Sequence, residues 1–157
     1  MRNRERLAYL AGFLDGEGWV GLLEVKRGRY RRWLVRMEFC NTNPHPLEMA
    51  RETFGGMIRL QKQHAQHHSP LFKLVIADRQ AIRAATLLLP WLRVKREQAE
   101  LILALAATRL DGPGRFQGLD PSVIEQREHI KARLTVLNRR GQQVAPAGPG
   151  MAKVSKA

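Results

Sequence analysis

Residues 32–42 alternate so regularly between two kinds of side chain that they constrain the fold more than any other segment. The odd positions carry Trp33, Val35, Met37 and Phe39, and the even positions carry Arg32, Leu34, Arg36, Glu38, Cys40 and Thr42. Because side chains of a β-strand point alternately to its two faces, this period predicts a strand with one apolar and one mainly polar face. Such a strand requires a sheet that is packed on one side and open on the other.

Three further segments are predicted to be strands and to form two hairpins. Residues 19–26 are rich in apolar and branched side chains, and the turn at Gly28-Arg29 separates them from residues 32–42. Residues 57–63 and 71–77 alternate in the same way, and a polar loop from His64 to Pro70 joins them. We therefore expect two β-hairpins.

Apolar residues recur with a helical period before each hairpin and again after the second one. The expected helices cover residues 4–16, 46–54, 79–89, 98–110 and 121–138. Asp78 and Asp120 stand directly before the third and fifth of these and are predicted as their N-caps. The order α-β-β-α-β-β-α-α-α favours an α+β fold with a four-stranded antiparallel sheet and helices on one of its faces.

The length and the few special residues limit the class of protein. A chain of 157 residues predicts one domain, here residues 1–138, and the Gly- and Pro-containing basic stretch 139–157 is predicted to be a disordered tail. No apolar run is long enough to cross a bilayer, so no membrane partner is expected. Cys40 is the single cysteine, which excludes an internal disulfide and favours an intracellular, reducing compartment such as the cytoplasm, the nucleoid or an organelle matrix.

The charge of the chain predicts a polyanionic partner. Lysine and arginine number 27 against 14 acidic residues, a formal net charge of +13. Much of this charge follows the first hairpin and the open sheet face, where hydrogen-bond donors suit nucleic acid. The candidate DNA contacts are Lys26, Arg27, Arg29, Arg32, Arg36, Glu38, Arg59, Gln61, Gln63 and Lys73. The alternative is a solvated charged face without a ligand.

Three histidines in the polar loop form a second candidate cluster. His64, His67 and His68 could be read as metal ligands, but no carboxylate or cysteine lies close to them in the sequence. A solvated loop or phosphate contacts are the preferred interpretation.

The segment Leu10 to Gly18 contains the most informative candidate site residues. Asp15 and Glu17 lie at the carboxyl end of the first predicted helix, where anions oppose the helix dipole unless a cation offsets them. A divalent metal is the natural candidate. Gly12 and Gly16 share one helix face without side chains, which would let a second helix approach closely.

This segment closely resembles the motif of the LAGLIDADG homing endonucleases, with Phe13 and Leu14 at the variable apolar positions. The segments 54–56 and 90–98 and the predicted order of helices and strands are also similar to that family. The resemblance implies a saddle-shaped sheet over the DNA major groove. Because the chain has one copy of the motif, the resemblance also implies a homodimer that recognises a palindromic or nearly palindromic site of double-stranded DNA.

The resemblance also implies roles for the residues of the motif. Glu17 corresponds to the ligand of Mg²⁺, and Gly16 would contribute its backbone carbonyl. Asp15 corresponds to the acid that caps the partner helix across the interface. That interface would also include Leu10, Ala11 and Gly12.

Two positions outside the motif correspond to the rest of the family's active centre. Lys95 matches the basic residue that stabilises charge or positions water, and Asn43 matches a polar residue that orders water. One departure concerns Leu47, where some members have an arginine; Arg51 is a candidate to fill that role.

The activity that the resemblance implies is Mg²⁺-dependent hydrolysis of DNA with a staggered double-strand break. An RNA maturase, or a regulator that binds DNA without cutting it, is the alternative, since one fold can serve several functions. The presence of Glu17 favours cleavage over the regulator.

Overall fold

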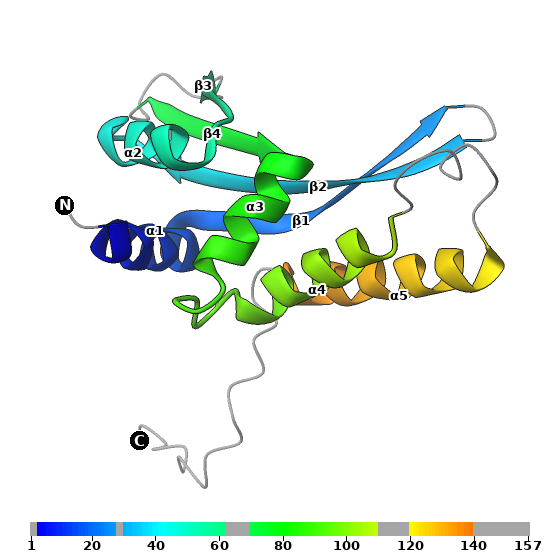
Figure 1. Ribbon diagram of the computed structural model, residues 1–157. Coiled ribbons are helices and arrows are strands. Elements are labelled where there is room, and N and C mark those ends of the chain that lie inside the picture. The colour runs from blue at the N-terminus through cyan, green and yellow to red at the C-terminus, as the bar shows by residue number, and fades with distance from the viewer. Residues whose placement is uncertain (1–2, 28–29, 62–69, 110–119, 140–157) are drawn as a thin grey trace, which may run out of the picture.

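The computed structural model of the chain describes residues 3–27, 30–61, 70–109 and 120–139. The element order agrees with the predicted one (Figure 1). The elements are α1 (Asn3–Glu17), β1 (Gly18–Arg27), β2 (Tyr30–Asn41), α2 (His45–Phe54), β3 (Met57–Gln61), β4 (Leu71–Ala77), α3 (Arg79–Leu88), α4 (Arg96–Ala107) and α5 (Pro121–Leu137). The histidine loop, Gln63, Arg29 and the tail from residue 140 onward lie outside the described residues.

The four strands form one antiparallel sheet in the order β1-β2-β4-β3. The later strand of the second hairpin therefore pairs with β2, and β3 lies at the edge. Val20 pairs with Met37, which in turn pairs with Ile76, so one apolar row crosses three strands. This register brings the buried positions of both hairpins onto the same face.

The predicted alternation of β2 is confirmed by its burial. Trp33, Val35, Met37 and Phe39 are buried, whereas the side chains between them are only partly buried. All five helices contact one another or the buried face of the sheet, and Figure 1 shows them gathered on one side. The predicted α+β fold with helices on one sheet face is confirmed.

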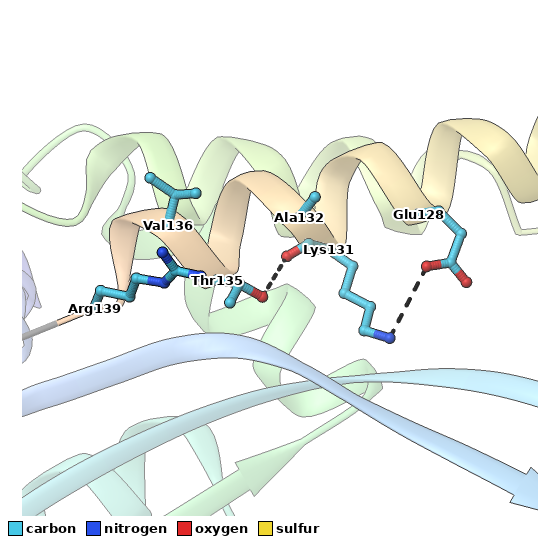
Figure 2. Close-up of a pocket in the computed structure, with 6 residues that line it drawn as sticks. All are labelled: Glu128, Lys131, Ala132, Thr135, Val136 and Arg139. Atoms are coloured by element: carbon cyan, nitrogen blue, oxygen red, sulfur yellow. Dashed lines mark hydrogen bonds and ion pairs between the residues drawn. The ribbon is translucent and has the colours of Figure 1, made fainter.

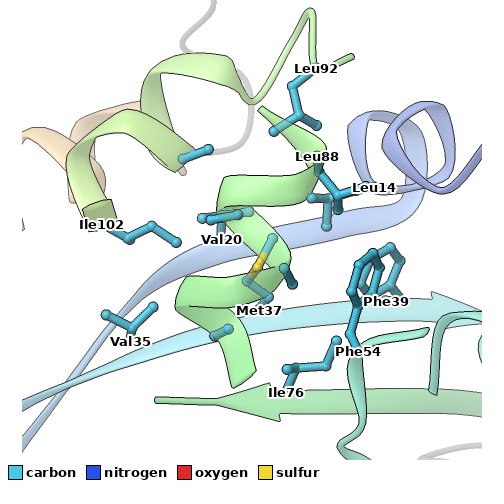
Figure 3. Close-up of a cluster of buried hydrophobic side chains, with 14 of the residues drawn as sticks. Leu14, Val20, Val35, Met37, Phe39, Phe54, Ile76, Leu88, Leu92 and Ile102 are labelled. Atoms are coloured by element: carbon cyan, nitrogen blue, oxygen red, sulfur yellow. The ribbon is translucent and has the colours of Figure 1, made fainter. Parts of the chain in front are cut away.

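The hydrophobic core fills the space between these helices and the sheet. Figure 3 shows Leu88 of α3 beside Leu14 of α1, with Met37 of β2 below them and Ile76 of β4 nearer to Phe54. All four side chains are fully buried. Burial of a large apolar side chain stabilises a fold by about 1.5–3 kcal/mol, so this shared core holds α1 and α3 against the sheet.

Helix α5 packs against α4 and β1. The Lys131 amine pairs with Glu24 of β1 and lies 4.0 Å from Glu128. Figure 2 shows this amine in a pocket along α5, directed toward the strands. The pocket is lined by Glu128, Lys131, Ala132, Thr135, Val136 and Arg139. The Lys131 amine therefore lies close to two carboxylates, those of Glu24 and Glu128.

The two predicted N-caps have different outcomes. Asp120 accepts a hydrogen bond from the backbone N–H of Ser122 at 2.8 Å, so the cap of α5 is confirmed. Asp78 occupies the predicted N-cap position of α3, but its side chain makes no capping hydrogen bond. Its backbone lies at φ 53°, and its carboxylate instead pairs with Arg32 at 3.3 Å and Arg109 at 2.5 Å. Two distant arginines outcompete the local N–H groups because an ion pair holds a carboxylate more strongly.

None of the helices in the described ranges is long and apolar enough to cross a bilayer.

Candidate functional site

The carboxyl end of α1 carries Asp15 and Glu17 and no basic residue in its last turn. The Asp15 carboxylate accepts hydrogen bonds from the backbone N–H groups of Arg93 and Lys95, at 2.8 Å each. Asp15 therefore docks the turn between α3 and α4 onto α1. These bonds join Asp15 to its own chain, and the expectation that Asp15 caps the helix of a partner subunit stays a prediction. Glu17 and Gly16 are exposed, so their carboxylate and backbone lie at the surface.

Lys95 lies directly before α4 and contacts the same end of α1. Its Nζ donates a hydrogen bond to the backbone carbonyl of Asp15 at 2.5 Å. Burial of the amine lowers the pKa of Lys95 below its usual value, and the nearby carboxylates of Asp15 and Glu17 partly offset this shift. The structure thus brings the Lys95 amine near two acids, Asp15 and Glu17, that precede it by about 80 positions in the chain.

Asn43 lies at the same end of the sheet as Glu17. Gly18, which follows Glu17, pairs with Phe39, and Asn43 comes shortly after β2 ends. The Asn43 side-chain oxygen accepts a hydrogen bond from the backbone N–H of His45 at 3.1 Å. This bond forms a local turn directly before α2, whose N-cap residue is Pro44.

Leu47 belongs to the hydrophobic core and is fully buried in α2. An arginine here would place a charge among apolar side chains. Arg51, one turn later on the same helix, is exposed.

The burial of α1 corrects two of the interface predictions. Leu10 and Ala11 are fully buried in the core of their own chain, so they offer no surface to a second copy. Gly12 and Gly16 are exposed, and a Cβ built on either would meet nothing within 4 Å. The exposed side of α1 therefore includes both glycines, together with Glu5 and Tyr9.

The sheet face opposite the helices holds most of the candidate DNA contacts. By strand alternation and register, this face presents Arg32, Arg36, Glu38, Arg59, Gln61 and Lys73. Lys26 and Arg27 lie in β1, but their side chains are outside the described part of the chain, as are Arg29 and Gln63. The exposed apolar residues Leu23 and Val25 share the face.

Asp78 and Arg109 were missed by the sequence reasoning. Asp78 joins Arg32 of β2 to Arg109, which follows α4 and also donates to the Trp33 backbone carbonyl at 3.3 Å. The residues are far apart in the chain, so no local pattern could show this connection. The only local signal, an acid before a helix, pointed to a cap instead.

Comparison with known proteins addresses the fold. No family model matches the chain, and no curated protein matches its sequence. Solved structures do match. The homing endonuclease I-CvuI in complex with its target has a TM-score of 0.70 and 22% identity, over 89% of this chain and 85% of that one. The archaeal intron-encoded homing endonuclease I-Vdi141I, complexed with DNA, has a TM-score of 0.70 and 16% identity, over 92% and 91%.

A third structure supplies the name of the fold. The LAGLIDADG homing endonuclease I-GzeII, in complex with a DNA target, matches with a TM-score of 0.56 and 14% identity, over 80% of this chain and 43% of that one. The chain has the LAGLIDADG homing endonuclease fold. It spans most of I-CvuI and I-Vdi141I but less than half of I-GzeII. Within the LAGLIDADG fold, the segment Leu10 to Gly18 forms the end of α1 and the first residue of β1.

Proposed function

We propose that this chain is a site-specific DNA endonuclease that acts as a homodimer and makes a Mg²⁺-dependent staggered double-strand break. One observation carries the proposal: the Lys95 amine is bonded to the Asp15 carbonyl, two residues before Glu17, at the end of α1 that leads into a sheet whose open face is rich in arginine and lysine. An acid and an amine beside a cationic surface suit hydrolysis of a phosphodiester. The DNA bound in the structures of I-CvuI and I-Vdi141I supports the choice of substrate.

The oxygen donors at the end of α1 fit a hard divalent cation. The exposed Glu17 carboxylate and the Gly16 backbone carbonyl are donors of the kind that Mg²⁺ prefers. Within the described residues no group of three or more His, Cys, Asp or Glu side chains could hold a metal. Glu17 of a second copy and the phosphate oxygens of DNA would complete the set. The I-CvuI structures were obtained in the presence of Mg or Ca. When bound, the metal would polarise the scissile phosphate and activate water.

Lys95 would supply the positive charge beside the reacting phosphate. Its Nζ is held by the Asp15 carbonyl, so the amine needs little reorganisation when charge develops on the phosphate oxygens. Half-burial strengthens this interaction because fewer waters screen it. Asn43, at the same end of the sheet, would order water there.

The open glycine face of α1 would form the dimer interface. With nothing within 4 Å of a Cβ at Gly12 or Gly16, the backbone of a second α1 could approach closely. Two-fold pairing would bring the two Glu17 residues together and present the same sheet face twice. The DNA site would then be long and nearly palindromic. Such a site suits an endonuclease of a mobile intron or intein. The protein would act in a reducing intracellular compartment.

Cleavage of a candidate site tests this function. The substrate is a duplex made by joining the sequences that flank this reading frame, incubated with purified protein and either Mg²⁺ or EDTA. A staggered double-strand cut that requires Mg²⁺, and that Glu17→Gln abolishes, is the expected result. Tight binding without any cut would overturn the endonuclease proposal, and RNA would be the next ligand to test.

A further inference from the structure

Glu38 is an acid in the middle of the cationic sheet face. The side chain is only 13% exposed, and its two carboxylate oxygens pair with different cations. Oε1 lies 2.6 Å from Nη2 of Arg36, and Oε2 lies 2.9 Å from Nζ of Lys73. We call Arg36, Glu38 and Lys73 the Glu38 cluster.

Strand register explains how the cluster forms. Arg36 and Glu38 are two positions apart on β2 and so point to the same face. Lys73 pairs with Cys40 across the β2-β4 ladder, which places it diagonally opposite Glu38 and within reach of a long side chain. The cluster therefore bridges the two central strands of the sheet.

An acid on a DNA-facing surface needs a reason, because it repels phosphate and weakens binding. The burial of its partners supplies one. The side chains of Arg36 and Lys73 are 28% and 26% exposed, whereas that of Arg32, nearer the hairpin tip, is 68% exposed. The Nε atom of Arg36 is buried and bonds to no residue that the structure describes. Glu38 therefore holds the Arg36 guanidinium at its Nη2 end.

The position of the cluster favours base edges over phosphates. Adjacent strands are about 4.8 Å apart and the major groove is about 12 Å wide, so the central strands of a sheet in the groove face its floor. Arginine and lysine there pair with the O6 and N7 atoms of guanine. Cations fixed in advance also lose less entropy when they bind.

We propose that Glu38 is a positioning residue that orients Arg36 and Lys73 to read guanine in each half-site. This inference rests on the proposed function, since it requires sequence-specific binding of duplex DNA. Each half-site then contains at least one guanine opposite the central strands, and the two-fold symmetry of the dimer repeats it in the other half.

Selection of bound duplexes from a randomised library tests the proposal with three proteins. These are the wild type, Glu38→Gln, and the control Glu100→Gln, which removes an acid paired with Arg96 at 3.0 Å on α4. Both variants gain the same charge. We expect Glu38→Gln to lower the preference for guanine at one symmetric pair of positions by about tenfold. Its affinity for random DNA should stay equal or rise. The control should keep the guanine preference of the wild type.

A base analogue makes the test independent of total affinity. Replacing the selected guanine by 7-deazaguanine removes the N7 acceptor, so the wild type should lose about tenfold in affinity and Glu38→Gln much less. If Glu38→Gln does not fold, the variant Arg36→Lys is used instead. A lysine at position 36 keeps the charge but lacks the planar two-donor edge of arginine.

The outcomes separate the two proposals. A wild type that selects no sequence would overturn both the proposed function and this inference. A wild type that selects a site while Glu38→Gln, or Arg36→Lys in its place, keeps the full guanine preference would overturn the inference alone.

Discussion

Asp15 and Lys95 each bond to the backbone of the other. The Asp15 carboxylate accepts the backbone N–H of Lys95, and the Lys95 amine donates to the backbone carbonyl of Asp15. This reciprocal pair ties the end of α1 to the start of α4. It also places the amine next to Glu17, whose carboxylate acts on the pKa of Lys95.

Asp15→Asn should therefore destabilise the fold. An amide cannot accept from both backbone N–H groups, and its own NH₂ would face one of them. We expect the free energy of unfolding to fall by about 1–3 kcal/mol, measured by urea denaturation. Glu17→Gln, on the same helix end, should not destabilise the chain because it removes an anion that opposes the helix dipole. Equal losses in both variants would contradict the assigned difference between the two acids.

Glu17→Gln should abolish cutting while leaving DNA binding largely intact. The carboxylate is exposed and lies outside the core, but it is the proposed metal ligand. The single-turnover cleavage rate with Mg²⁺ should fall by roughly 100-fold or more. Glu52→Gln, an exposed acid 3.7 Å from Arg6, serves as the control. Cutting by Glu17→Gln at the wild-type rate would refute the active-site assignment.

Gly12→Leu should separate the two subunits without harming the fold of each one. A Cβ at this position meets nothing within 4 Å in the chain itself, and leucine favours a helix over glycine by up to about 0.8 kcal/mol. Analytical ultracentrifugation should show a dimer for the wild type and a monomer for this variant. Gly12→Ala, with a smaller side chain, should weaken the dimer less. A dimer of unchanged affinity in Gly12→Leu would place the interface elsewhere.

Lys95→Arg should change the pH dependence of cleavage. Burial lowers the pKa of Lys95 from 10.5, so the positive charge of the wild type is lost as the pH rises through that lowered value. The cleavage rate should fall over the same range. A guanidinium stays charged in proteins, so the alkaline decline should move upward or vanish in Lys95→Arg. Rates between about pH 7 and 10 measure this. Lys131→Arg on α5 is the control and should decline as the wild type does.

Leu47→Arg should unfold the chain rather than restore an arginine to the active centre. The position is fully buried, and an unpaired charge there should lower the free energy of unfolding by at least about 3 kcal/mol. Leu47→Met should be tolerated because it keeps the volume and the apolar character. Arg51→Gln tests the alternative source of the arginine: it should slow cleavage and leave the melting temperature unchanged.

Much of the fold could be predicted because it depends on local periodicity. The alternation in residues 32–42 identified the buried and open faces of β2, and helical periodicity identified the helices to within a few residues at each end. The motif placed Asp15 and Glu17 at the end of that helix. Each of these predictions needed only neighbours within one or two turns.

The connections between distant residues could not be predicted in this way. Asp78 was expected to cap α3, yet it pairs with Arg32 and Arg109. Leu10 and Ala11 were expected at an interface, yet they complete the core. A side chain's partner depends on which strands and helices become neighbours, and that information is spread over the whole chain.

The sequence by itself determined the order of elements, the faces of the strands and the presence of an acid pair at a helix end, because hydrophobic burial acts with the periods of helices and strands. Only the tertiary structure decided the strand order β1-β2-β4-β3, the bonds between Asp15 and Lys95, and the pairing of Glu38 with Arg36 and Lys73. Charged side chains exchange partners at little energetic difference in water, so packing of the surrounding elements selects the pairs that form.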